Sequence, residues 1–543
     1  MIKNKGIETK EGFMKGVLIL MISQALIKML GLVSKVYLTN KDGFGDVGNG
    51  IYGSGYQIYA MLLTISSIGV PNAISKLISE KIAIKEYNEA YRIFKIALIT
   101  FGLIGLTGTL ILFFGSQVIA NVIDVPEAAI SLQVLSPSIT FVTITSVFRG
   151  YFNGLDKVSI TAKSQSLEQI FKTVVTIVAV ELIGIASNCN TILMAAGANL
   201  ATTISVISSF VYIYIYYKFL KSTIEYKLIR KKCSTNDSYI KILKMLISIS
   251  IPITISAIMT TLSKIVDIIT VVKGLKKFLS DTAAKAQYGI LSGKVDTLTT
   301  LPLSFNIAFA TALVPSVSSS IAKGNIDLAS KRISLSLLIT MIIGLPCTFG
   351  MYIFAEPILK LLFPNAIDGK ILLQIHSFTI IFAVLTQTTI GALQGLGKVK
   401  APAYICFIGV IVKLILNLIL VPNSKIGVNG AAIASVVNNI ISFILTFIIL
   451  RRTIKLSLKF NQFIIKPIIL TFVMCVCSYW LYTYLICIIS SKLATILVIL
   501  VAVIIYLIMV IILKIFNEEE IVMIPYGIKI YKILKKVGIY YKK

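Results

Sequence analysis

Apolar stretches of about 20 residues recur along the whole chain, and each is long enough to cross a bilayer as a helix. Polar residues, glycines and prolines separate these stretches and predict fourteen membrane spans. The approximate centres of the predicted spans are Met21, Leu63, Leu103, Phe141, Val174, Ser205, Ala257, Phe305, Ile339, Phe382, Ile411, Val437, Val473 and Val503. The chain has 543 residues, of which 57% are hydrophobic and 14% are charged, and its mean hydropathy is +0.91. A soluble fold could not cover so much apolar surface. The sequence therefore predicts an all-α polytopic membrane protein.

The charged residues predict how the spans are oriented. The chain carries 52 Lys and Arg residues against 23 Asp and Glu residues, which gives a net charge of +29. With the N-terminus in the cytoplasm, the cytoplasmic segments hold 35 of these basic residues and the external loops hold 9. Because Lys and Arg accumulate in cytoplasmic loops, we predict a cell-membrane protein with both termini in the cytoplasm. This topology explains the charge without a nucleic-acid partner, and only the external loop from Lys273 to Lys285 departs from the trend.

An internal repeat predicts two related halves. The segment NGLDKV at 153–158 matches QGLGKV at 394–399, and the same shift of 241 residues carries Lys172 onto Lys413. Repeats with an even number of helices have the same orientation, so we predict two pseudo-symmetric six-helix lobes around a central cavity. The predicted parts are lobes over residues 1–225 and 238–455, two further helices over 460–516, and a basic cytoplasmic tail over 517–543.

Eight basic residues fall in or near the predicted spans. A cation at the middle of a bilayer is costly, so such residues usually face a wet cavity or a partner. Lys28 and Lys35 are two helical turns apart and share one face of the first span. Together with Lys76, they have no obvious local acid. The eight residues are Lys28, Lys35, Lys76, Arg149, Lys172, Lys264, Lys294 and Lys413.

Two acids are spaced to pair with a lysine on the same helix. Glu168 precedes Lys172 by four residues, and Lys264 precedes Asp267 by three. The cavity would still keep surplus positive charge, which suits an anionic substrate such as a phosphate. The candidate substrate-binding residues are Lys28, Lys35, Lys76, Lys172, Arg149, Lys264 and Lys294.

A second group of residues is a candidate for energy coupling or ion pairing. Asp267 and Asn417 could form a cation site, but Lys413 lies four residues before Asn417 and would supply its own positive charge. We therefore favour the membrane potential, acting on charges in the cavity, as the energy source. The candidates are Glu168, Asp267, Asn417 and Lys413.

Motifs for catalysis or metal binding are missing from the sequence. The chain contains neither GxxxxGK[ST] nor HExxH, its only histidine is His376, and its seven cysteines form no CxxC pair. We therefore expect no enzyme activity, no cofactor and no metal site. The glycine-rich run GFGDVGNGIYGSG at 43–55 is expected to allow close helix approach or a bend near an external gate.

Three segments carry a resemblance to a known family. They are IKMLG at 27–31, PNAISK at 71–76, and RGYFNG at 149–154 followed by SQSLEQIFK at 164–172. Over nearly its whole length the chain resembles MurJ-type lipid II flippases and stage V sporulation protein B. These are polysaccharide-biosynthesis proteins of the multidrug/oligosaccharidyl-lipid/polysaccharide exporter superfamily.

The resemblance implies a function and a site. It implies alternating-access transport of an undecaprenyl-pyrophosphate-linked oligosaccharide, of the kind that lipid II represents, from the inner to the outer leaflet. It also implies that Lys28, Lys35, Lys76 and Lys172 bind the pyrophosphate and that the helices over 460–516 form a groove for the lipid tail. Arg is common in the family where this chain has Lys at 28, 35 and 172, so the charge is kept while the bidentate geometry is lost.

Two other functions stay open. One is a cation-coupled multidrug exporter of the same superfamily, although exporters of cationic drugs need acids in the cavity and this cavity is basic. The other is a scaffold in a complex of cell-wall synthesis proteins, with the basic tail held on anionic membrane lipids. That tail interleaves tyrosines with Lys529, Lys532, Lys535 and Lys536. Whether the role is in vegetative growth or in sporulation also stays open.

Overall fold

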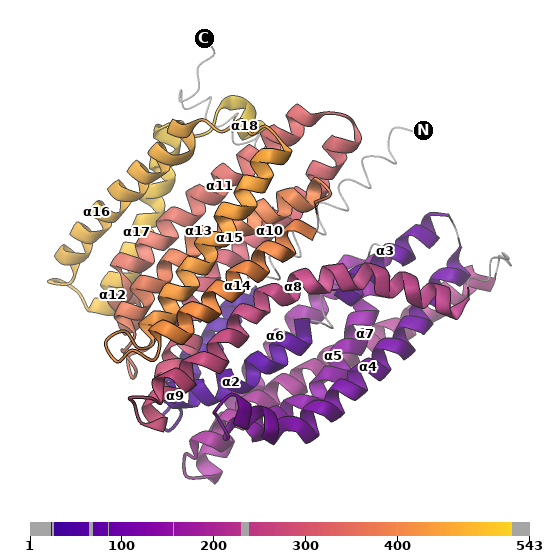
Figure 1. Ribbon diagram of the computed structural model, residues 1–543, viewed down its shortest axis with the longest axis horizontal. Coiled ribbons are helices and arrows are strands. Elements are labelled where there is room, and N and C mark those ends of the chain that lie inside the picture. The colour runs from indigo at the N-terminus through magenta and orange to yellow at the C-terminus, as the bar shows by residue number, and fades with distance from the viewer. Residues whose placement is uncertain are drawn as a thin grey trace. The chain divides into compact units, whose positions relative to one another are not determined.

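The fold is seen in a computed structural model that describes residues 23, 26–64, 69–84, 86–155, 157–229, 238–398, 400–523 and 531. In this part of the chain every regular element is a helix (Figure 1). Residues 26–40 are helical. The elements that follow are α2 (Gly45–Thr64), α3 (Val70–Ala83), α4 (Tyr87–Val122), α5 (Ala128–Gly154), α6 (Val158–Ala186), α7 (Thr191–Ile229), α8 (Tyr239–Leu275), α9 (Asp281–Gly289), the π-helix η2 (Ile290–Val295), α10 (Asp296–Ala322), α11 (Ile326–Ile353), α12 (Ala355–Leu362), α13 (Lys370–Gly395), α14 (Lys400–Leu420), α15 (Asn429–Thr453), the π-helix η3 (Asn461–Ile465), α16 (Lys466–Leu485), α17 (Ser491–Ile512) and α18 (Glu518–Met523).

The helices agree with the spans predicted from hydropathy. Among the described residues, ten helices are long and apolar enough to cross a membrane. Every predicted span centre lies on a helix except Met21, which lies outside the described residues. The helices at the other centres are α2, α8 and α10, in addition to the ten. The prediction of an all-α polytopic membrane protein is confirmed.

The chain divides into two compact units. Unit 1 comprises Met1–Leu298 and Val410–Ala431, and unit 2 comprises Thr299–Gly409 and Ala432–Lys543. Helix α14 therefore begins in unit 2 and ends in unit 1. The units are defined by compactness and not by internal symmetry. The predicted six-helix lobes, the two further helices and the basic tail therefore stay predictions, and the four lysines of that tail lie outside the described residues.

The core of unit 1 forms where α3, α4, α5 and α7 pack together. The ring of Phe94 lies with its centroid 4.5 Å from that of Tyr151 and 5.3 Å from that of Phe148. Glycines bring α5 against α3, since a Cβ on Gly150 would lie 2.9 Å from the Cα of Pro71. This packing fixes α5, which carries Arg149, relative to its neighbours.

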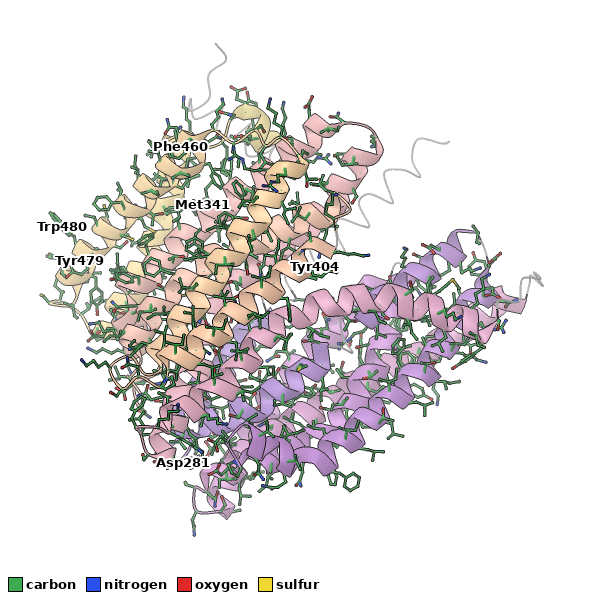
Figure 2. The ribbon with its side chains drawn as sticks, viewed as in Figure 1. Asp281, Met341, Tyr404, Phe460, Tyr479 and Trp480 are labelled. Carbon is green, nitrogen blue, oxygen red and sulfur yellow. The ribbon has the colours of Figure 1, made fainter. Side chains whose placement is uncertain are left out.

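Unit 2 has a separate apolar core on α11 and α13, which α15 completes. Outside that core, α16 carries large aromatic side chains that point away from the helices, as Figure 2 shows for Tyr479 and Trp480. The side chain of Trp480 is 74% exposed. In a membrane protein such a surface contacts lipid, and amphipathic rings of this kind favour the bilayer interface.

Candidate functional site

Helix α2 uses glycines on one face to lie directly against its neighbours. A Cβ on Gly50 would lie 2.3 Å from the carbonyl oxygen of Lys285 in α9, and one on Gly53 would lie 2.8 Å from the Oγ of Ser292 in η2. Any larger residue would push the helices apart. The close approach expected for the glycine-rich run is therefore found in the structure, and it holds α2 in place.

A ladder of tyrosines runs along α2 beside these glycines. Tyr52, Tyr56 and Tyr59 are spaced four and three residues apart, so they share a helix face. The rings of Tyr52 and Tyr56 are stacked, with their centroids 5.7 Å apart and an interplanar angle of 9°. The centroid of the Tyr59 ring lies 5.8 Å from that of Tyr56.

Two lysines from other helices lie over the first two rings of this ladder. The Nζ of Lys35, on the helix over residues 26–40, lies 4.3 Å from the centroid of the Tyr52 ring. The Nζ of Lys172, on α6, lies 4.0 Å from the centroid of the Tyr56 ring. Both distances are typical of cation–π contacts, in which an ammonium is attracted to the negative face of the ring.

Lys28 and Lys264 join these two lysines to form what we call the lysine cluster. Lys172 and Lys264 are electrostatic neighbours of Lys35, and Lys264 is also a neighbour of Lys28. Lys264 comes from α8, so three helices of unit 1 contribute to the cluster. Each of the four members therefore interacts with at least one other lysine of the cluster, and two of them, Lys35 and Lys172, also contact a ring.

Two carboxylates, those of Asp296 and Glu168, accompany the cluster. The Oδ2 of Asp296 lies 4.0 Å from the Nζ of Lys264, and Asp296 is also an electrostatic neighbour of Lys35. Glu168 is an electrostatic neighbour of Lys172. When all are ionised, four ammonium groups and these two carboxylates leave a surplus of two positive charges, and Glu168 is in addition paired with Arg149. Such an arrangement can hold a compact polyanion.

Arg149 lies beside this region but has its own partners. Its guanidinium donates to the Oε2 of Glu168 at 2.7 Å and to the Oγ of Ser164 and of Ser209, both at 2.9 Å. Glu168 therefore forms its ion pair with Arg149 and not with Lys172, which corrects the pairing expected from the sequence. Arg149 and Glu168 both line a cavity of about 440 Å³, which also includes Gln165.

Lys76 has an acidic residue nearby, although the sequence suggested no obvious local acid for it. Its Nζ lies 4.0 Å from the Oε1 of Glu80, and both side chains are more than half exposed. In the described part of the chain, Lys76 is not among the electrostatic neighbours of Lys28 or Lys35. A role for Lys76 beside Lys28 and Lys35 therefore stays a prediction.

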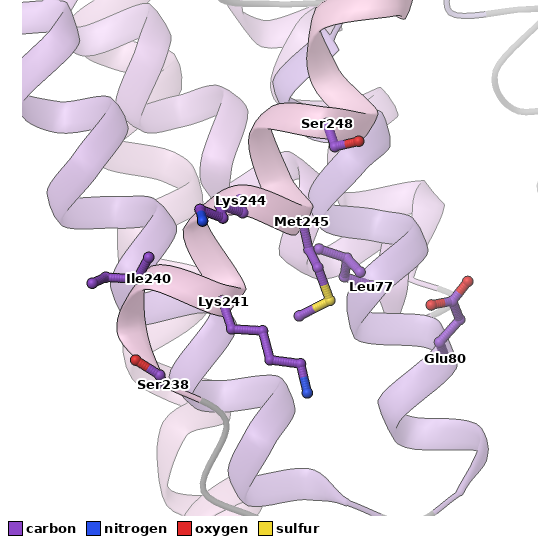
Figure 3. Close-up of a pocket in the computed structure, with 8 residues that line it drawn as sticks. All are labelled: Leu77, Glu80, Ser238, Ile240, Lys241, Lys244, Met245 and Ser248. Atoms are coloured by element: carbon purple, nitrogen blue, oxygen red, sulfur yellow. The ribbon is translucent and has the colours of Figure 1, made fainter.

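Near Lys76, a second cavity of about 790 Å³ lies between α3 and α8 (Figure 3). Met245 of α8 extends toward Leu77 of α3, and Lys241 and Lys244 leave α8 in different directions. The cavity is lined by Leu77, Glu80, Ser238, Ile240, Lys241, Lys244, Met245 and Ser248. Lysines beside apolar side chains at a helix end are typical of residues that reach toward a membrane interface.

Lys294 is fully buried and paired. It lies in η2, and its Nζ donates to the Oδ2 of Asp46 at 2.8 Å. The ion pair joins η2 to the start of α2, at the point where the glycines bring the two elements together. Lys294 thus contributes to helix packing, and a role in substrate binding stays a prediction.

Asp267, Lys413 and Asn417 lie together, as the sequence suggested. The Nζ of Lys413 donates to the Oδ2 of Asp267 at 2.6 Å and to the carbonyl oxygen of Ser263 at 2.9 Å. The Nδ2 of Asn417 donates to the Oδ1 of Asp267 at 3.0 Å and to the Oγ1 of Thr270 at 2.8 Å. Asp267 is therefore paired with Lys413 and not with Lys264, which corrects the second expected pairing.

Two residues of the site were not identified from the sequence. Tyr52 and Tyr56 lie inside the glycine-rich run, which was interpreted through its glycines alone. Their spacing of four residues indicates that they share a helix face. It does not indicate which other helices supply the ammonium groups. Among the described residues, no group of three or more His, Cys, Asp or Glu is placed to hold a metal ion.

Comparisons with known proteins agree with this architecture. A family model described as polysaccharide biosynthesis protein matches residues 13–321, and the MatE family model matches residues 252–419. Stage V sporulation protein B of Bacillus subtilis (strain 168) is 26% identical over 463 residues, covering 84% of this chain and 86% of that protein. Lipid II flippase MurJ of the same organism is 24% identical over 460 residues, covering 82% of this chain and 84% of that protein.

Solved structures show the same fold. Lipid II flippase MurJ in an inward closed conformation matches with a TM-score of 0.66 and 17% identity, covering 92% of this chain and 99% of that chain. A multidrug resistance MATE family transporter in an inward-facing conformation matches with a TM-score of 0.64 and 14% identity, covering 80% of this chain and 97% of that chain. The chain belongs to the polysaccharide biosynthesis protein family, as a MurJ-like and stage V sporulation protein B-like multi-pass transporter of the multidrug/oligosaccharidyl-lipid/polysaccharide exporter superfamily.

Proposed function

We propose that this protein is a flippase that moves a lipid-linked oligosaccharide, joined to its lipid by pyrophosphate, from the inner to the outer leaflet. The observation that carries the proposal is the lysine cluster of Lys28, Lys35, Lys172 and Lys264, whose four ammonium groups outnumber the two carboxylates beside them, Asp296 and Glu168. The cluster would bind the pyrophosphate during alternating access. Transport of this kind needs no covalent step, so we propose no enzyme activity and no cofactor.

The positive charge of the cluster favours one of the two candidate transport functions, the flippase and the cation-coupled multidrug exporter. Like charges on membrane helices repel one another and lose hydration, so their grouping is costly unless an anion spends time among them. A cationic drug would add to that repulsion, whereas a pyrophosphate would relieve it. This argument favours the flippase over a cation-coupled multidrug exporter. The names of the relatives, a lipid II flippase and a sporulation protein, support a substrate of cell-wall or spore-wall synthesis.

The remaining basic residues have a smaller part in the proposed site. Arg149 and Lys294 each have a carboxylate partner within 2.8 Å, and Lys76 is more than half exposed beside Glu80. A pyrophosphate would have to compete with those carboxylates. We therefore assign binding to the lysine cluster and regard the other three as supporting charges. Anionic lipids and cell-wall synthesis proteins stay proposed partners of the cytoplasmic surface.

The test is complementation of a strain that is depleted of its own lipid II flippase, with membrane levels of each variant checked by blot. Lys28→Ala should abolish rescue, Lys28→Arg should retain it because the positive charge is kept, and Lys28→Glu should be inactive. Lys163→Ala is the matched control, because Lys163 is an exposed lysine of α6 outside the cluster. Full rescue by Lys28→Glu would exclude an electrostatic role for this position and count against the proposal.

A further inference from the structure

We infer that Tyr52 and Tyr56 are positioning residues of the anion site, whose stacked rings hold Lys35 and Lys172 as a fixed pair of ammonium groups. This inference rests on the proposed function and adds to it the residues that prepare the empty site for a pyrophosphate. Neither tyrosine carries a charge of its own at neutral pH. Their contribution therefore acts through the two lysines.

The two contacts are similar in distance, although Lys172 also interacts electrostatically with both tyrosines. Each ammonium lies close to the centroid of its own ring, at 4.3 Å for Lys35 on Tyr52 and 4.0 Å for Lys172 on Tyr56. The two rings are nearly parallel and one helical turn apart. Lys35 and Lys172 come from different helices, so α2 is the element that sets their common spacing.

Helix α2 is well suited to this role because it cannot easily move. Its glycine face lies against backbone atoms, with a Cβ on Gly50 reaching 2.3 Å from the carbonyl oxygen of Lys285. Tyr52 is only 5% exposed, and Tyr59 closes the far end of the ladder at 1% exposure. A tyrosine ring has only two side-chain torsions, so little conformational entropy is lost when it is held. Rigid rings can therefore order the more flexible lysine side chains.

A lysine that contacts an aromatic ring can still bind an anion, whereas a lysine that is paired with a carboxylate is already neutralised. Within the same unit, Lys294 and Lys413 are paired with Asp46 and Asp267 at 2.8 and 2.6 Å. An incoming phosphate would have to displace those carboxylates. A ring face attracts the ammonium without neutralising it, so the full charge of Lys35 and Lys172 stays available to an anion.

The inference is tested with a double-mutant cycle on the full-length protein in detergent, using inorganic pyrophosphate as the probe and calorimetry as the measurement. Tyr56→Leu should weaken pyrophosphate binding about 3- to 30-fold, the range expected for a lost cation–π contact. Tyr56→Phe keeps the ring but removes the hydroxyl that also interacts with Lys172, so it should retain more of the affinity than Tyr56→Leu. In a Lys172→Ala background, Tyr56→Leu should change the affinity by less than about 2-fold, because the partner is already gone.

A matched control comes from the next ring of the ladder. Tyr59→Leu removes a ring whose contact is with Tyr56, so its effect should be the same with and without Lys172. The same cycle applies to Tyr52 and Lys35. If Tyr56→Leu does not fold, fluorinated phenylalanines at position 56 keep the shape of the ring and weaken its negative face step by step. Affinity should then fall with each added fluorine.

The outcomes separate this inference from the proposed function. If Lys35→Ala and Lys172→Ala both bind pyrophosphate like the unmodified protein, the proposed function fails. If these two variants lose affinity while the effects of the tyrosine and lysine substitutions on affinity are additive, only the positioning role of the rings is overturned. A fluorination series without effect on affinity would overturn that role as well. The positioning role is supported if the tyrosine and lysine substitutions are coupled in both cycles and Tyr56→Phe binds pyrophosphate more tightly than Tyr56→Leu.

Discussion

Lys413 of α14 and Asp267 of α8 form a buried ion pair, with the Nζ of Lys413 at 2.6 Å from the Oδ2 of Asp267 and side-chain exposures of 3% and 10%. Asn417 donates to the other oxygen of the same carboxylate. The carboxylate is thus satisfied on both sides, with a positive charge that the chain itself supplies. Because α14 begins in unit 2 and ends in unit 1, this pair anchors a helix that belongs to both units.

Breaking this pair from one side should be more damaging than replacing both partners. Lys413→Met leaves an uncompensated buried carboxylate and should cost about 3–5 kcal/mol of stability, the usual cost of breaking a buried pair. The double change Lys413→Met with Asp267→Leu removes both charges and should recover much of that loss. Thermal unfolding in detergent, followed by fluorescence, measures the difference. Equal losses in the single and double variants would contradict a buried ion pair.

The ammonium group of Lys413 also leads to a prediction about the energy source for transport. Since the ammonium of Lys413 already holds a position next to Asp267 and Asn417, a free sodium ion is not needed there. In proteoliposomes, replacing sodium by choline should leave the flipping rate unchanged. A membrane potential should alter that rate, because charges of the lysine cluster experience the field. Transport that stops without sodium would show that coupling occurs through a cation site.

The loop from Lys273 to Lys285, which is predicted to be external and departs from the charge trend, has acidic residues close to two of its lysines. Lys285 of α9 is 3% exposed and contacts Glu127 at 2.5 Å as well as Asp281. Lys276 lies 2.6 Å from Asp281 and 3.5 Å from Asp124. Lys276 and Lys285, two of the four lysines of this loop, are therefore paired with acids from the α4–α5 connection and from α9 itself.

The contacts of Lys285 with Glu127 and Asp281 can be tested by exchanging the charges. Lys285→Glu places three acids together and should lower stability by about 2 kcal/mol or more, a typical cost of losing a hydrogen bond to a charged group. Glu127→Lys alone should also be destabilising. The double exchange restores opposite charges and should recover at least half of the loss of Lys285→Glu. Thermal midpoints in detergent provide the measurement, with Lys273→Glu as a control in the same loop.

A pH effect is expected at α12, outside the membrane-spanning helices. Hydrogen bonds from Lys360 and Lys370 lower the pKa of Glu356 from 4.5 to about 2. Because the folded pKa lies below the unfolded one, the stabilisation is present above about pH 4.5 and is lost as the pH falls toward 2. The group is largely solvated, so the effect should stay below about 1 kcal/mol.

Glu356→Gln isolates this contribution. Its thermal midpoint should lie slightly below that of the unmodified protein at pH 7, and the two should converge as the pH falls toward 2. High salt should reduce the difference at pH 7, since exposed ion pairs are screened. A difference that grows toward low pH would show that the sign of the pKa shift is wrong.

The topology can be checked with reporter fusions. The split of 35 basic residues against 9 predicts that both termini and the segment from Lys218 to Lys244 lie in the cytoplasm. A cytoplasmic fluorescent reporter fused after residue 543 should fluoresce, and a periplasmic-type phosphatase fused there should be inactive. A fusion in the connection between α16 and α17 should give the opposite result. Phosphatase activity at the C-terminus would break the fourteen-span arrangement.

The helices and the type of site could be predicted from the order of the residues alone. Hydrophobic length is a property of consecutive residues, so the apolar stretches were enough to predict an all-α membrane protein. The cost of charge in a bilayer was enough to select Lys28, Lys35 and Lys172 as candidates, because that cost does not depend on which helices are neighbours. Spacing along one helix also predicted a shared face for Lys28 and Lys35.

The partner of each buried charge, in contrast, depends on how the helices pack. Local spacing predicted that Glu168 pairs with Lys172, yet Glu168 pairs with Arg149, 19 residues away, and Asp267 pairs with Lys413, 146 residues away. A pair on one helix gains little by itself, whereas a buried charge needs the strongest partner that any packed helix brings near. For the same reason the rings under Lys35 and Lys172 could not be predicted: they belong to α2, and its place depends on glycines that contact α9 and η2.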